Sequence, residues 1–386
     1  MAESRKNRGP QPSGISDCGS SRGGRIPGSE KLSITSMATL HVLPWCKLAA
    51  TYTSGPVSLL SIDRSSPHED WDEFTTESIL AVLDDFVGVD GNPISACSLV
   101  SVGGRILLED YPEAREVETL RDYVDLACVA CLSGRELLTT AEPYCNSDCF
   151  SVYERQYRRG WGTSAPPIRR RDDIRIGLTG LALKVHAPKH TVPLMKLSLE
   201  EAFFEGLSDF RSKLIRSGRA QQWASWQESI FCFNQANTDS GMIPHHIEWV
   251  LMVSAIQRVL KAPSKEEGFA RSLRSELFPN NSKRRAGEMV ESWAREFYRF
   301  RGNYAHGKLR PHGKAQWPPQ QHLICGSIVF PLLLKILLQR EGMYHLTKSD
   351  AAQAYALARL LEELRDPAVQ LRGWHQYIED ELAVEG

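Results

Sequence analysis

The sequence lacks the short motifs of the commonest nucleotide-binding and hydrolytic enzymes. It contains no GxxxxGK[ST] phosphate loop, no GxGxxG dinucleotide fingerprint, no HExxH zinc helix and no GxSxG nucleophile elbow. Long apolar runs are also scarce. The longest, residues 323–338, is interrupted by Gly326, Pro331 and Lys335 and is shorter than the ~20 residues of a bilayer span. Any chemistry must therefore be built without these motifs, and we expect no membrane partner.

A secretory leader is missing as well. Residues 1–38 are rich in Ser, Gly and basic residues and have no apolar core, so we expect a disordered tail, and the true start could lie at Met37. The nine cysteines are an odd number in a long chain without an export signal, which favours reduced thiols over disulfides. These features predict a soluble, cytoplasmic protein.

The remaining sequence predicts an α+β protein with two domains. Residues 39–195 mix short strands with helices and form a domain of unknown role, such as a sensor or targeting module. Residues 198–386 read as an all-α bundle, which Ser198 and Glu201 would open with a capping box. We expect strands at 39–48, 57–62, 96–102, 105–108 and 174–186, and helices at 75–86, 113–139, 199–217, 221–236, 244–261, 265–277, 285–306, 321–340, 348–365 and 367–382.

Charge is strongly segregated although the net formal charge is only −1. Residues 63–125 carry 16 acidic and 4 basic side chains, which most simply form a solvated face. Residues 155–219 carry 14 basic and 6 acidic side chains, and residues 283–314 carry 9 basic and 3 acidic ones. A positive segment attracts phosphates.

An arginine and a histidine close the helix expected at 285–306, where residues 297–308 read FYRFRGNYAHGK. Trp293, Phe297, Phe300 and Tyr304 share one helical face and predict its buried side. Arg301 lies at the edge of that face. Gly307 is suited to a left-handed C-cap, so the His306 imidazole can turn back towards Arg301. Such a pair can hold a phosphate and transfer protons.

Other Arg–His pairs have similar spacing. Arg299 with His306 and Arg340 with His345 both fit, although the second pair reads as a helix exit and turn at Gly342. The plain alternative for 297–308 is a basic helix end on the surface, without chemistry.

Two further groups of residues suggest binding sites. Cys128 and Cys131, followed by Cys145 and Cys149, could supply four thiolates to zinc, although the first pair falls in an apolar helix where cysteines are ordinary packing residues. The basic stretches 155–161 and 169–171, interleaved with aromatics, could bind a nucleic acid or form a solvated interdomain loop.

Residues 221–345 resemble the HEPN family (higher eukaryotes and prokaryotes nucleotide-binding), in particular its ApeA-like members. The resemblance rests on the helix at 226–239, the apolar helix at 243–256 and the ending AHG at 305–307. It implies a helical bundle that dimerises so that two motifs face one cleft.

Active HEPN proteins are endoribonucleases that need neither metal nor other cofactor, and toxins and antiphage effectors are common among them. The resemblance assigns catalysis to Arg301 and His306, with Asn303, Arg299 and Lys308 as supporting RNA-binding residues. The chain departs from the family pattern at Gly302, because a polar residue usually follows the arginine and here Asn303 comes one position later. A non-catalytic HEPN-like protein that binds nucleotides or RNA, or that only dimerises, is the alternative.

Overall fold

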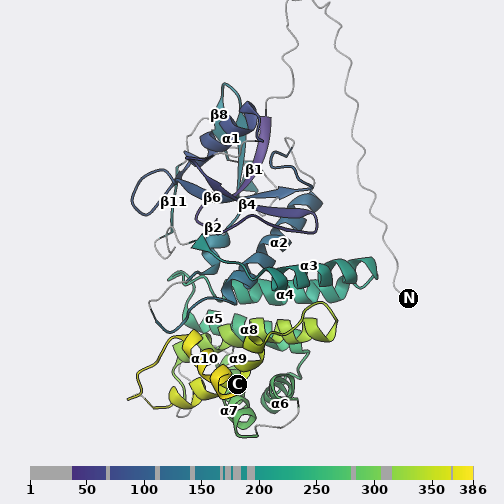
Figure 1. Cartoon of the computed structure of the whole chain (residues 1–386), viewed down its shortest axis with the longest axis vertical. Helices are drawn as coiled ribbons and strands as arrows, with labels where there is room; N and C mark the ends of the chain where they lie inside the picture. Colours follow the sequence, from purple (N-terminus) through teal and green to yellow (C-terminus); the bar gives the residue numbers. More distant parts are fainter. Residues whose placement is uncertain are drawn as a thin grey trace, which may run out of the picture. The chain divides into compact units, whose positions relative to one another are not determined.

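A six-stranded antiparallel sheet is followed by a helical C-terminal region, which confirms the predicted α+β class (Figure 1). The computed structural model describes residues 37–66, 70–108, 114–139, 144–165, 168–169, 175–176, 184–188, 196–279, 284–305, 315–366 and 368–385. The tail expected at 1–38 therefore lies outside the described residues, except for Met37 and Ala38.

The sheet has the strand order β3-β4-β6-β1-β7-β8. The central strand β1 pairs with β6 on one side and with β7 on the other, with Val42 opposite both Leu99 and Tyr153. The strands are β1 Met37–Leu43, β3 Tyr52–Ser54, β4 Val57–Asp63, β6 Ala96–Val102, β7 Tyr153–Arg158 and β8 Gly162–Ser164.

Alternation along the strands gives the sheet two buried faces. Leu40 and Val42 pack on one side with the helix α1 Glu73–Leu83. On the other side Leu43 and Val100 join the core built around α2 Ala114–Leu132, which also contains the C-terminal helices. The second core is therefore continuous from the sheet into the helical region.

Several two-residue strands complete the β structure: β2 Lys47–Leu48, β5 Phe86–Val87, β9 Ile168–Arg169, β10 Arg175–Ile176, β11 Val185–His186 and β12 Lys196–Leu197. The strand expected at 39–48 is split into β1 and β2, because Pro44 cannot donate a ladder hydrogen bond. Residues 105–108 form only isolated bridges at Arg105 and Leu108.

The C-terminal region consists of helices that pack face to face. Its elements are α3 Glu201–Arg216, α4 Ala220–Gln235, α5 His245–Leu260, α6 Glu266–Leu277, α7 Arg284–Ala305, α8 Pro319–Arg340, α9 Lys348–Glu363 and α10 Trp374–Glu385. Most bounds agree with prediction within two residues. The last helix is an exception, since it begins at Trp374 and not at 367.

The apolar run 323–338 lies inside α8, the one described helix that is long and apolar enough to cross a membrane. Most of that helix is buried within the protein. Its Lys335 is also buried and pairs with Glu200 at 2.6 Å and with Asp350 at 2.7 Å. These properties are typical of the core helix of a soluble protein.

Two local predictions were wrong. The N-cap of α3 is Glu200, whose side chain makes no capping hydrogen bond, so Ser198 and Glu201 do not form the expected capping box. The stretch 155–161 is mainly strand β7 and not a solvated loop. Its Arg155 is buried, pairs with Asp85 at 3.2 Å and covers the Phe86 ring at 5.0 Å. Arg155 is therefore engaged within the fold.

Candidate functional site

Helix α7 is positioned by the aromatic face that its spacing predicts. Trp293, Phe297 and Phe300 are fully buried. Trp249 of α5 packs against Phe297, Phe300 and Tyr304 with ring centroids 5.5–5.6 Å apart. Its indole nitrogen also donates a 2.9 Å hydrogen bond to the Phe297 carbonyl oxygen. The last turns of α7 are thus fixed against the start of α5, because Trp249 lies near the first turn of that helix.

Most arginines of α7 are neutralised by carboxylates. Arg284 pairs with Glu288 at 2.8 Å, Arg295 with Glu291 at 2.9 Å and Arg299 with Glu296 at 3.6 Å. Arg285 pairs with Glu362. The positive charge that the sequence shows around the motif is therefore largely cancelled along the helix. Arg299, expected to support RNA binding, is held by Glu296 and lies over the Phe300 ring at 5.3 Å.

Arg301 differs from these neighbours. Its side chain is half-buried, and no ion pair or hydrogen bond joins it to another side chain within the described parts of the chain. Its Nε is buried without a hydrogen-bond acceptor, and its guanidinium lies 5.9 Å from the centroid of the Tyr298 ring. A guanidinium without a carboxylate partner keeps its donors available for a phosphate.

The residues after Arg301 are only partly described. Gly302, Asn303 and Tyr304 are half-buried in the last turn of α7, which ends at Ala305. His306, Gly307 and Lys308 lie outside the described residues, so the separation of Arg301 from His306 and the proposed Gly307 cap stay predictions. A side chain at Gly302 would meet no atom within 4 Å, so packing does not require glycine there.

A buried carboxylate of α7 binds the residues that follow the segment containing His306. Glu296 of α7 accepts hydrogen bonds from the backbone amides of Gln316 (3.0 Å) and Trp317 (3.1 Å) and from His322 Nε2 (3.1 Å). Residues 316 and 317 thus contact α7 at Glu296, nine residues before the last residue of that helix. We call Glu296, His322 and these two amides the Glu296 clamp.

The protonation states of the clamp follow from its partners. Burial alone would raise the pKa of Glu296, but the hydrogen bonds from His322, Gln316 and Trp317 hold the pKa below its ordinary value. Burial lowers the pKa of His322, although the neighbouring Glu296 opposes that shift. An ionised Glu296 thus accepts from a neutral His322, whose ring stacks on Phe297 at 5.5 Å.

An open pocket of about 460 Å³ adjoins the start of α5. His245 and Glu248 line it, and His246 between them contacts the Tyr304 ring at 5.9 Å. Buried Arg135 donates to Asn237 and to the Cys145 carbonyl oxygen there, again without an ion pair among the described residues. The end of α7 therefore lies near a pocket whose lining combines Arg135 and His245 with the carboxylates of Asp239 and Glu248.

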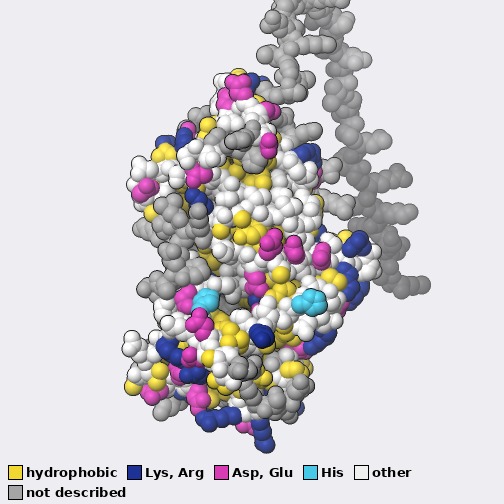
Figure 2. Space-filling view, viewed as in Figure 1, with side chains coloured by type: hydrophobic (Ala, Val, Ile, Leu, Met, Phe, Trp, Pro, Cys, Tyr) yellow, Lys and Arg dark blue, Asp and Glu magenta, His cyan; other side chains and the backbone are white. Residues whose placement is uncertain are grey.

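The surface charge differs from the sequence expectation for residues 155–219. On α3 the exposed side chains of Glu201, Glu205 and Asp209 form a stripe, and exposed Arg216 and Arg219 follow at its far end. Figure 2 shows acidic side chains gathered across the middle of one face and basic ones at its edge. Among the residues of this segment that the structure describes, basic side chains thus share that face with acidic ones.

The cysteines pack as thiols in the core. Cys128, Cys131, Cys145 and Cys149 are all buried, and none of them is in a disulfide. Burial raises the pKa of Cys145 to about 12 and also raises the pKa of Cys131 well above its ordinary value. Among the described residues no group of three or more His, Cys, Asp or Glu side chains is placed to hold a metal ion, so the zinc alternative gains no geometric support.

The structure adds Glu296, His322, Arg135 and Asn237 to the residues that sequence reasoning identified. One signal was readable: Glu296 falls three residues after Trp293 and four before Phe300, on the apolar face, where a carboxylate must find partners. The second Arg–His pair gains nothing, because Arg340 pairs with Glu276 at the exit of α8.

No protein-family model matches the chain, and no curated protein or solved structure matches it either. The functional argument therefore depends on the residues themselves and on the resemblance described above.

Proposed function

We propose that the protein is a HEPN-type endoribonuclease whose catalytic pair is Arg301 and His306. The single observation that carries the proposal is the unpaired Arg301, since the other α7 arginines all have carboxylate partners within the described residues. An arginine that is half-buried without a counter-ion lies at an energetic cost, which an incoming phosphate would relieve.

In the proposed reaction His306 removes the proton from a ribose 2′-hydroxyl. The 2′-oxygen then attacks the adjacent phosphorus and the bond to the 5′-oxygen breaks, with a proton returned to that leaving oxygen. The products are a 2′,3′-cyclic phosphate and a 5′-hydroxyl. Arg301 stabilises the negative charge on the phosphorane. A positioned acid–base group contributes about 10²–10⁴-fold to the rate, and an electrostatic donor contributes a comparable factor.

The Glu296 clamp supports this assignment. It holds Gln316 and Trp317, which follow the segment that contains His306, against α7, and Arg301 lies five residues beyond Glu296 on the same helix. A catalytic pair needs such preorganisation, because small displacements of reacting groups reduce rates strongly. Asn303 and Lys308 would then contact the RNA backbone next to the pair.

We also propose a cytoplasmic homodimer with a toxin or antiphage role. Met242 is 88% exposed and Ile247 is 43% exposed beside His246, which contacts Tyr304 at the end of α7. A twofold contact at this apolar surface would bring two motif ends together. Ile247→Glu should then yield a monomer by light scattering. A wild-type chain that is monomeric at micromolar concentration and still cleaves RNA would contradict the shared cleft.

Cleavage of single-stranded RNA in EDTA by the full chain tests the main proposal. Arg301→Ala and His306→Ala should each reduce the rate by at least about 10²-fold, with unchanged far-UV circular dichroism. Arg295→Ala is the matched control, because this arginine is on the same helix but is paired with Glu291. Full activity in a folded His306→Ala variant would refute the assignment.

The second candidate is an RNA- or nucleotide-binding protein without catalysis. It is favoured by Gly302, which stands where active HEPN proteins usually have a polar residue. In that case wild type binds RNA in a filter assay without cleaving it, and Arg301→Ala loses binding whereas His306→Ala keeps it.

A further inference from the structure

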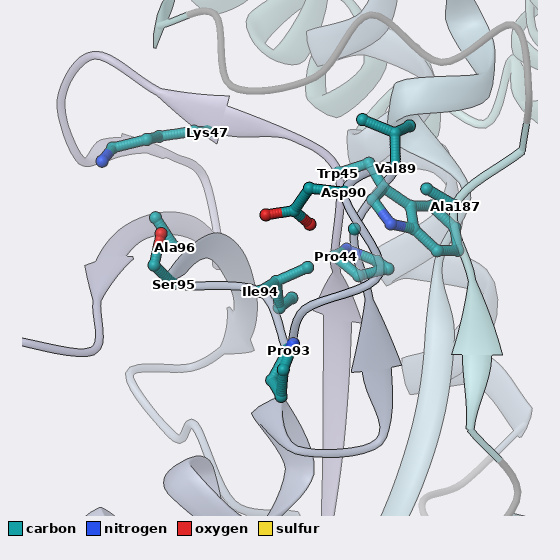
Figure 3. A pocket seen from close by; sticks show the side chains of 11 residues that line it. Pro44, Trp45, Lys47, Val89, Asp90, Pro93, Ile94, Ser95, Ala96 and Ala187 are labelled. Atoms are coloured by element: carbon teal, nitrogen blue, oxygen red, sulfur yellow. The ribbon is translucent and has the colours of Figure 1, made fainter.

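A small pocket opens in the N-terminal sheet region, away from α7. Its volume is about 130 Å³, and it lies between the turn after β1 and the loop that joins β5 to β6. Figure 3 shows the Asp90 carboxylate reaching into it, with Trp45 and Ala187 on one side and Lys47, Ser95 and Ala96 on the other. The rest of its wall is apolar, from Pro44, Val89, Pro93 and Ile94.

A buried donor in this pocket has no acceptor. Trp45 is only 9% exposed, and its Nε1 makes no hydrogen bond in the structure. Its ring is fixed by edge contacts with Tyr153 at 5.1 Å and Phe86 at 6.1 Å, so it cannot easily turn towards solvent. A buried indole nitrogen usually has a partner. Because Nε1 has almost no accessible surface, a ligand oxygen reaches it only when the pocket wall shifts slightly, and such a contact would supply the missing acceptor.

The carboxylate at the pocket, Asp90, is exposed to solvent and is oriented by a neighbouring residue. Asp90 accepts from the backbone amide of Asn92 at 3.1 Å and from its side-chain amide at 3.0 Å. These hydrogen bonds lower the pKa of Asp90, so it is ionised at neutral pH. No cation pairs with it among the described residues, since Lys47 is engaged by Asp63 at 3.2 Å.

We propose that this pocket binds the α-amino end of a small apolar amino acid, either free or as the first residue of a peptide. The ammonium group would pair with Asp90, the adjacent carbonyl or carboxylate oxygen would accept from Trp45 Nε1, and the side chain would lie against Pro44, Pro93 and Ile94. The volume suits one residue, because pockets for larger organic ligands measure roughly 300–1,000 Å³. The pocket would make the sheet region a sensor of such amines.

Indole N–H resonances of the full chain report on binding directly. The Trp45 signal is assigned from its loss in Trp45→Phe, a change that removes the donor and keeps an aromatic ring. Titration with L-valine, L-valinamide and Val-Gly-Gly should move this signal downfield, because Nε1 gains an acceptor. N-acetyl-L-valine lacks the charged amine and should leave it unmoved. Binding of free valine identifies an amino-acid sensor, and binding of only the amide and the tripeptide identifies a peptide N-terminus.

Asp90→Asn is the decisive variant, since asparagine keeps the oxygen that accepts from Asn92 and removes only the charge. It should weaken L-valinamide binding about tenfold or more, whereas Asp84→Asn, an aspartate outside the pocket that pairs with Arg64, should not. Three results would overturn the proposal: no shift with any amine at millimolar concentration, equal binding of N-acetyl-L-valine, or unchanged affinity in a folded Asp90→Asn variant.

Discussion

Two basic side chains of adjacent helices show opposite states of pairing. Lys335 in the last third of α8 is 3% exposed and contacts two carboxylates, Glu200 and Asp350. Both carboxylates lie within hydrogen-bond distance of the Tyr344 hydroxyl, whose one proton is donated to one of them at a time. Arg301 at the end of α7 is half-buried and contacts no carboxylate among the described residues. Judged by burial alone, Lys335 would be the more unusual of the two, since lysine is rarely buried. The pairing shows that Lys335 joins α3, α8 and α9, whereas Arg301 keeps its donors free.

Whether a buried charge has a partner of opposite sign distinguishes a structural role from a functional one. A buried ion that is fully paired has its desolvation offset within the fold, so removing one member leaves an uncompensated charge and weakens the fold. An unpaired ion contributes little to the fold, and its removal changes what the surface can bind. Each variant below tests one side of this contrast.

The largest effect is expected at Lys335. Lys335→Met keeps the apolar stem and leaves Glu200 and Asp350 without a cation, so the free energy of unfolding should fall by about 3–5 kcal/mol. Arg301→Ala should change it by less than about 0.5 kcal/mol. Urea denaturation of both variants measures the difference. Equal losses in the two variants would remove the distinction, and Lys335→Met/Asp350→Asn should recover part of the loss.

The Glu296 clamp should have a smaller and more local effect. Glu296→Gln weakens hydrogen bonds to the amides of Gln316 and Trp317, at a cost of about 1.5–3 kcal/mol. Hydrogen exchange at these two amides should accelerate, and RNA cleavage should fall because the segment with His306 loosens. Glu291→Gln is the control, since that carboxylate pairs with Arg274 and Arg295 and with neither amide. Unchanged exchange at residues 316–317 would contradict the clamp.

Asp125 of α2 is an intermediate case, paired with a neutral amide instead of a cation. Asn234 Nδ2 donates to it at 2.9 Å, and burial raises the pKa of Asp125 to about 6. Because this lies above the ordinary value of ~3.9, the protonated form is favoured in the folded state. Its stabilising contribution is complete below about pH 4 and is lost as the pH rises through 6.

Asp125→Asn should therefore raise the free energy of unfolding at pH 8, by up to about 3 kcal/mol, and change it little at pH 4. Denaturation curves at the two pH values measure this. The change at pH 8 should exceed that of Asp148→Asn, a half-buried aspartate in the short helical turn Ser147–Phe150. A gain equal at both pH values would point to packing instead of ionisation.

Much of the fold was predictable because it follows local periodicity. The helical spacing of Trp293, Phe297 and Phe300 gave α7 to within one residue, and alternation gave β4 and β6. Arg155 shows where this failed: its basic neighbours suggested a loop, and only the distant Asp85 and Phe86 make a buried arginine acceptable within β7. Such partners are contributed by the tertiary fold.

In the candidate site, too, some features could be predicted from the sequence and others depend on the tertiary fold. Arg301 was identifiable from its position at the edge of an apolar face, but its lack of a partner was not, because Glu288, Glu291, Glu296 and Glu362 could have paired with any nearby arginine. The Asp90 and Trp45 pocket left no local signal. Its two polar groups lie far apart in sequence, and the turn after β1 and the β5–β6 loop bring them together.

The smallest effect is expected at Gly302, where two helical glycines give a matched test. A Cβ at Gly302 meets no atom within 4 Å, whereas a Cβ at Gly206 of α3 would lie 2.6 Å from the Met343 carbonyl oxygen. Gly302→Ala should therefore stabilise α7 by about 0.5–1 kcal/mol through helix propensity. Gly206→Ala should destabilise by about 1–3 kcal/mol, since backbone must move. Thermal denaturation measures both changes.

Gly302→Asn should be tolerated equally and would place a polar group directly after Arg301, so RNA cleavage should hold or increase a few-fold. If Gly302→Asn abolished cleavage in a folded protein, the glycine itself would be required beside Arg301, and the non-catalytic reading of Gly302 would be wrong.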